Sequence, residues 1–112
     1  MQVRSVIGAL AVALLTACQP ALKAEQFAGS WRSSRLATPI HLHTSGEWEI
    51  RGDEGRALQL GVWQLQDRSI HWTVRLGDGR LMHEINPVVS WTGQRFQLRE
   101  RDGSVTTFER RH

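Results

Sequence analysis

Residues 69–79 read SIHWTVRLGDG, and this stretch decides the fold. Apolar side chains alternate with polar ones along it, at Ile70, Trp72, Val74 and Leu76. A strict period of two is typical of a half-buried β-strand. The Gly-Asp-Gly sequence at 77–79 predicts a tight hairpin turn into an antiparallel neighbour.

The same period continues on both sides of this strand. It predicts eight short strands, over residues 27–33, 38–44, 47–51, 56–65, 70–76 and 81–91, then around Phe96 and Leu98, and over 104–110. None of the connections is long enough for a parallel crossover, which takes about a dozen residues. We therefore expect an all-β, eight-stranded antiparallel up-and-down meander that forms a small barrel or half-barrel.

Two positions predict irregularities in this meander. The apolar phase changes from Leu58 and Leu60 to Trp63 and Leu65, with Gly61 at the change. A β-bulge at Gly61 would explain both the shift and the glycine. Pro87 lacks an N–H donor, so it is expected at an edge, a bulge or a strand break.

The N-terminus has the layout of an export signal. Arg4 precedes an apolar run at residues 6–15, which leads into Leu15-Thr16-Ala17-Cys18 and the only cysteine of the chain. A membrane-spanning helix would need about 20 residues, whereas a run of this length suits a signal peptide. The arrangement resembles the signal peptide and lipobox of a bacterial lipoprotein. A lone buried cysteine after an apolar N-terminal helix is the alternative.

The resemblance implies a domain organisation and a location. Residues 1–17 would form a signal helix that is cleaved, 18–26 a lipid anchor and tether, and 27–112 the β domain. Cys18 would carry acyl chains such as palmitate and hold the protein on a membrane. Because Gln19, rather than aspartate, follows the cysteine, we expect the outer membrane, with the protein facing the periplasm.

Charge argues against nucleic acid as a partner. Without Arg4 the chain has 13 basic and 11 acidic residues, a net charge of +2. Basic residues alternate with acidic ones, whereas a nucleic-acid footprint gathers them on one face. Four arginines near the C-terminus are expected to cluster where the last two strands pair, namely Arg99, Arg101, Arg110 and Arg111.

The tryptophans form a pattern of Gly-x-Trp units. They occur at 29–31, 46–48 and 61–63, and the last predicted strand contains Thr-Phe-Glu-Arg at 107–110. This pattern resembles the small lipocalin-like domains of exported bacterial lipoproteins, which implies a meander barrel and no particular activity. Large rings supply the apolar area that a small domain without disulfides needs. Two tryptophans, Trp48 and Trp91, are the candidates for stacking on a ligand instead.

Other side chains suggest chemistry only weakly. His41 and His43 share one strand face about 7 Å apart, and with His71 or His83 they could bind zinc or copper. Glu47 and Glu49 also share a face, but beside Arg51 they are expected to be solvated. Nucleophile and phosphate-loop motifs are missing, so we expect no enzyme and no cofactor.

The leading expectation is a non-catalytic binding module at the outer membrane, for a small apolar ligand or a periplasmic protein partner. One alternative is a periplasmic lysozyme inhibitor, although the chain lacks tyrosine and the usual disulfide. Another is a metal carrier built on His41 and His43.

Overall fold

The computed structural model describes residues 21–112, which form an eight-stranded antiparallel barrel. The predicted signal peptide, Cys18 and the first residues of the tether lie outside the described residues. A short 3-10 helix, η1 (Ala24–Gln26), precedes the strands β1 (Gly29–Ser33), β2 (Ile40–Leu42), β3 (Glu47–Arg51), β4 (Ala57–Gln66), β5 (Ser69–Arg75), β6 (Leu81–Trp91), β7 (Arg95–Arg99) and β8 (Val105–Arg110). Each strand pairs with the next along the chain.

The barrel closes between its first and last strands. Trp31 of β1 lies opposite Arg110 of β8, and Ser33 lies opposite Phe108. The predicted all-β meander of eight strands is therefore confirmed, and of its two forms the closed barrel is observed. Closure removes the free strand edges that could recruit other chains.

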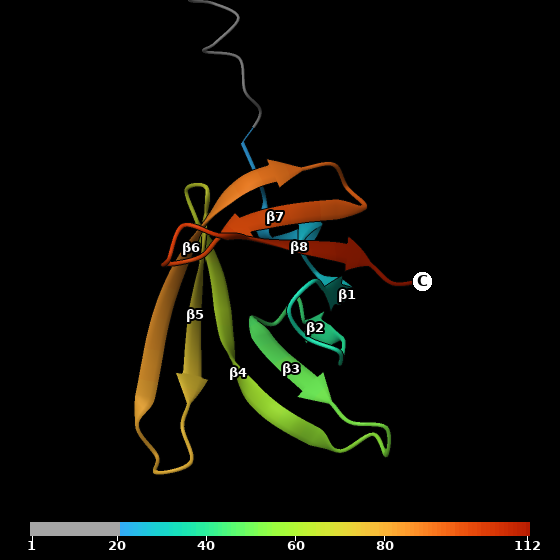
Figure 1. Ribbon diagram of the computed structural model, residues 1–112, viewed down its shortest axis with the longest axis vertical. Helices are drawn as coiled ribbons and strands as arrows, with labels where there is room; N and C mark the ends of the chain where they lie inside the picture. Colours follow the sequence, from blue (N-terminus) through green and yellow to red (C-terminus); the bar gives the residue numbers. More distant parts are fainter. Residues whose placement is uncertain (1–20) are drawn as a thin grey trace, which may run out of the picture.

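The two ends of the barrel differ. The long strands β4, β5 and β6 extend past the others toward the turns at 52–55 and 76–80, while the chain enters at the opposite end, near β7 and β8 (Figure 1). Aromatic rings fill the end where the chain enters. Phe27, directly after η1, packs on Trp91 at 4.8 Å and on Phe96 at 5.0 Å between ring centroids, and Trp31 meets Phe96 at 4.6 Å. We call this the closed end.

The Arg110 side chain links several segments at the closed end. Its guanidinium lies 4.2 Å from the centroid of the Trp31 ring. It donates hydrogen bonds to the main-chain oxygens of Gln26, Ala28 and Gly93, at 3.1, 3.0 and 3.1 Å. One side chain therefore links the last strand to the segment before β1 and to the β6–β7 turn.

The inward and outward faces follow the predicted alternation in most strands. In β5, Ile70 and Trp72 are buried and Val74 packs against the core. In β3, Trp48 and Ile50 are buried between exposed or half-buried neighbours. The first strand is shorter than predicted because Phe27 ends η1 rather than starting β1.

The bulge predicted at Gly61 was wrong. Gly61 pairs regularly with Trp48 on one side and Val74 on the other, and the irregularity between β3 and β4 lies at Arg51, opposite Ala57. The apolar phase changes because Leu58 and Leu60 point outward and are exposed. Gly61 has a different role: a Cβ there would collide with the Trp48 indole and with the Thr73 carbonyl.

Pro87 lies opposite Ser69, next to a register shift between Val88 and Ser90 in the pairing of β6 with β7. Its place beside a bulge is one of those predicted. Within residues 21–112, no helix has the length and apolar character needed to cross a bilayer.

Candidate functional site

The barrel interior opens into a pocket at the end opposite the closed end. We call this pocket the cup; it has a volume of about 240 Å³. Its apolar wall consists of inward-facing side chains from four strands, Ile40, Trp48, Ile50, Trp72, Val74 and Phe108. An eight-stranded barrel has the size at which side chains either fill the interior or leave room for one small ligand, and the side chains at this end leave a pocket between them.

Two indoles form the rigid part of the wall. The Trp48 and Trp72 rings are perpendicular, with centroids 6.1 Å apart. Trp48 Nε1 donates to the Thr73 carbonyl at 3.3 Å, and Trp72 Nε1 donates to Asn86 Oδ1 at 2.8 Å. Asn86 in turn donates to the Arg99 carbonyl at 3.1 Å. Because each ring N–H is bonded, the rings are held in place without a ligand.

Two carboxylates also line the cup, and sequence reasoning did not single out either of them. Glu84 is half-buried and lies opposite Trp72 in the pairing of β5 with β6. Glu100, just after β7, accepts a hydrogen bond from Thr106 Oγ1 at 2.8 Å. Residues 82, 84 and 86 alternate in phase with the buried Val88 and therefore lie on the inward face of β6. The alternation with Val88 could have shown from the sequence that Glu84 points inward. The apolar Leu81 and Ile85 have the opposite phase and point outward, so the pattern of apolar residues in β6 was ambiguous.

Of the two tryptophans expected to meet a ligand, only Trp48 lines the cup. Trp91 packs at the closed end against Phe27 and Trp31. The structure therefore does not bring the two together. Sequence alone could not separate them, because both follow the same alternation and differ only in which end of the barrel they reach.

A second hollow lies on the outer face of the sheet. We call it the outer groove; it measures about 910 Å³ and runs between the polar side chains of β3 and outward side chains of β4 and β5. Leu60 and Val62 are exposed along it, and Leu81 borders it. The indole of Trp48 reaches it across Gly61.

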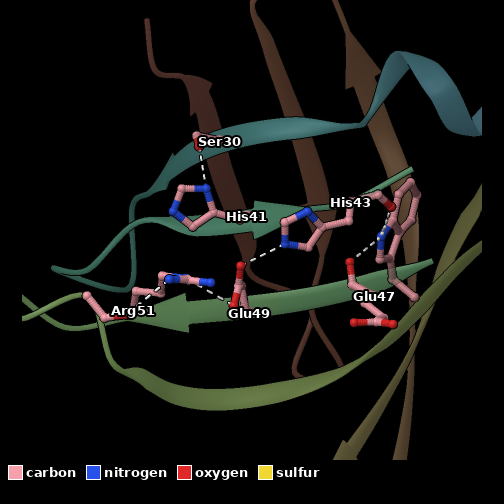
Figure 2. Close-up of polar contacts among 8 residues, drawn as sticks. Ser30, His41, His43, Glu47, Glu49 and Arg51 are labelled. Carbon is pink, nitrogen blue, oxygen red and sulfur yellow. Dashed lines mark hydrogen bonds and ion pairs between the residues drawn. The ribbon is translucent and has the colours of Figure 1, made fainter. Parts of the chain in front are cut away.

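His41 lies on the outer face of β2 and His43 directly follows that strand, and the two imidazoles lie side by side (Figure 2). Their rings are nearly parallel, with centroids 6.5 Å apart. His41 Nδ1 hydrogen-bonds Ser30 Oγ at 2.5 Å, and His43 Nε2 meets Glu49 Oε1 at 2.8 Å. In the described part of the chain, no three His, Cys, Asp or Glu side chains gather in a way that could hold a metal ion. The pair is thus engaged in a polar network with its neighbours.

Glu49 is the centre of that network. The hydrogen bond from His43 and then the one from Arg51, at 3.1 Å, hold the pKa of the Glu49 carboxyl below its usual value. Glu47 shares the strand, and its main-chain oxygen accepts a hydrogen bond from Trp63 Nε1 at 3.0 Å (Figure 2). The two glutamates therefore have different environments, but neither faces the cup.

The C-terminal arginines do not form the expected single cluster. Arg99 bonds the Gly103 carbonyl in the β7–β8 turn, whereas Arg110 is at the closed end, at the other end of the same hairpin. The prediction did not allow for the length of the hairpin, which separates Arg99 and Arg101 from Arg110 and Arg111.

Comparison with known proteins adds no family assignment: no family model, no curated protein and no solved structure matches this chain.

Proposed function

We propose that this protein is a non-catalytic binding module that takes the apolar part of a small molecule into the cup. One observation carries the proposal: the barrel is packed with rings at one end and open between ordered indoles at the other. Ligand sites in proteins are mostly concave and apolar, with a few placed polar groups.

The size of the cup limits the ligand. Typical pockets for small molecules measure about 300–1,000 Å³, and the cup, at about 240 Å³, is smaller. Since one water takes up about 30 Å³ of liquid, the cup holds a group of roughly eight non-hydrogen atoms. A larger ligand would place one end inside and leave the rest in solvent.

The expected lipid anchor complements this arrangement. Cys18 precedes η1 by only a few residues, which extended chain could stretch over roughly 20 Å. Since η1 belongs to the closed end, a protein held at Cys18 would turn its closed end to the outer membrane and its cup toward the periplasm. The resemblance to exported lipoproteins agrees with the anchor, whereas the ligand part of the proposal rests on the cup alone.

Mass spectrometry of the full chain, isolated from membranes without chelator, tests both parts. Under denaturing conditions we expect the mass of a chain beginning at Cys18 plus acyl chains. Under native conditions we expect a further non-covalent mass of a small organic molecule, absent from a variant in which Ile50→Trp fills the cup. An unmodified cysteine would refute the anchor. If the filled variant carried the same additional non-covalent mass as wild type, the ligand proposal would fail.

A further inference from the structure

The acidic groups of the cup allow a ligand class to be inferred. An inward position of a barrel strand normally carries an apolar side chain. Glu84 occupies such a position; within residues 21–112 its carboxylate has neither a hydrogen bond nor an ion pair, and its oxygens are reached by water through the open cup. It stands beside Trp72, its cross-strand partner, where Cβ atoms are about 5 Å apart.

The cationic side chain that borders the cup, Arg35, is already engaged by other residues. Its guanidinium donates to Ser104 Oγ. The same hydroxyl donates to Asp102 Oδ1 at 2.6 Å, and the charge of Arg35 helps lower the pKa of the Asp102 carboxyl after the larger effect of the Ser104 bonds. Arg35 and Asp102 therefore balance each other at the rim, and Glu84 and Glu100 leave the cup itself negative.

This charge discriminates among ligands. A neutral apolar molecule that filled the cup would take water away from Glu84 and give nothing back, and an unpaired buried charge is strongly unfavourable. An anion would add repulsion from Glu100. An ammonium group, in contrast, would donate to a carboxylate and lie near the rings of Trp48 and Trp72, which attract cations through their faces.

We propose that the cup binds an organic cation, an ammonium group carrying a short apolar substituent of roughly eight non-hydrogen atoms. The substituent packs between Trp48, Trp72 and Phe108, and the ammonium pairs with Glu84, with Glu100 as the second acceptor. This inference rests on the proposed function, because it requires that the cup is a binding site.

Three probes of one shape test it: 2-phenylethylammonium, 2-phenylethanol and phenylacetate, which share a phenyl ring and differ in head group. Each is titrated into the full chain at neutral pH, and tryptophan emission excited at 295 nm is recorded. We expect the ammonium to bind at least tenfold more tightly than the alcohol and the acid to bind least. Both the ammonium and the alcohol can donate to the Glu84 carboxylate, but only the ammonium adds the attraction between opposite charges and the attraction of a cation to the indole faces.

Matched variants assign the effect to its residue. In Glu84→Gln, binding of the ammonium should weaken about tenfold or more while binding of the alcohol is unchanged or stronger. Glu54→Gln, in the exposed β3–β4 turn, should leave all three probes as in wild type. If Glu84→Gln fails to fold, Glu100→Gln is the substitute, with a smaller loss expected.

The outcomes separate the two proposals. Equal binding of all three probes would overturn the cation proposal and keep the cup as a site for apolar ligands. Binding of none of them up to millimolar concentration would overturn both. Preference for the ammonium that survives in Glu84→Gln and in Glu100→Gln would mean that another acceptor is responsible, and would also overturn the assignment.

Discussion

Replacing Arg110 by alanine tests whether the closed end holds the barrel together. The guanidinium bonds three main-chain oxygens, two before β1 and one in the β6–β7 turn, and stacks on Trp31. Alanine removes all four contacts at once. Because the pairing of β1 with β8 closes the barrel next to this residue, the loss falls on the closure itself.

The magnitude follows from these contacts. A hydrogen bond to a charged group contributes about 1.5–3 kcal/mol, but the three bonds share one side chain and do not add fully. Counting two bonds at the lower value and about 1 kcal/mol for the ring contact gives about 4 kcal/mol. A domain of 92 residues has roughly 5–14 kcal/mol of stability in total, so the variant should lose about a third or more of it.

Urea unfolding of the full chain, followed by tryptophan fluorescence, measures this loss. With a slope of about 1–2 kcal/mol per molar urea, the midpoint should fall by roughly 2–4 M. Arg111→Ala is the control, because Arg111 is exposed and its hydrogen bond to Ser30 comes from the main chain. Arg110→Lys should lie between the two, since lysine keeps the charge without the planar fork. If Arg110→Ala came within about 1 kcal/mol of the control, the assigned role would be wrong.

Two further predictions concern the neighbouring strands β3 and β4. Gly61→Ala should destabilise the protein by about 2 kcal/mol or more through overpacking, because the new Cβ would collide with the Trp48 indole and the Thr73 carbonyl. Gly52→Ala is the control, because a Cβ there would make ordinary contacts. Equal urea midpoints for the two variants would contradict the steric argument. Folding lowers the pKa of Glu49, so its stabilising contribution is complete above the unfolded pKa and disappears as the pH falls through the folded one. The stability difference between wild type and Glu49→Gln should therefore be present at pH 6 and shrink as the pH falls below the ordinary glutamate pKa of about 4.3, whereas a Glu47→Gln difference that showed the same pH dependence would argue against the local network as its cause.

The order and type of the strands could be predicted because alternation and turn residues are local signals. The β5 phase, from Ile70 to Val74, needed nothing beyond its own neighbours. Closure could not be predicted, because it depends on residues about 80 positions apart, such as Trp31 and Arg110. The phase of β4 was misread for a physical reason: the rule that apolar side chains point inward fails where a sheet exposes leucines, as at Leu58 and Leu60.

The candidate site was predicted only in part for a related reason. Large rings are conspicuous in a sequence, so Trp48 could be named, but its partner Trp72 looked like an ordinary core residue. Glu84 was hidden because charged residues on strands are usually solvated, and only its phase relative to Val88 marks it as inward. Which tryptophans reach the open end depends on strand stagger around the barrel, and no single segment encodes that.

The two ends of the barrel contribute differently to the stability of this small domain. A carboxylate at Glu84 stands where an apolar side chain could contribute about 2 kcal/mol by burial, and the cup leaves the space between its indoles unfilled. A domain of this size has little stability to spare. The closed end compensates, because Arg110 and the rings around Phe96 concentrate their contacts at the end away from the cup. A ligand bound in the cup, as we propose, would leave the contacts that hold the fold undisturbed. Changes at the closed end should then alter stability, whereas the choice of ligand would depend on Glu84.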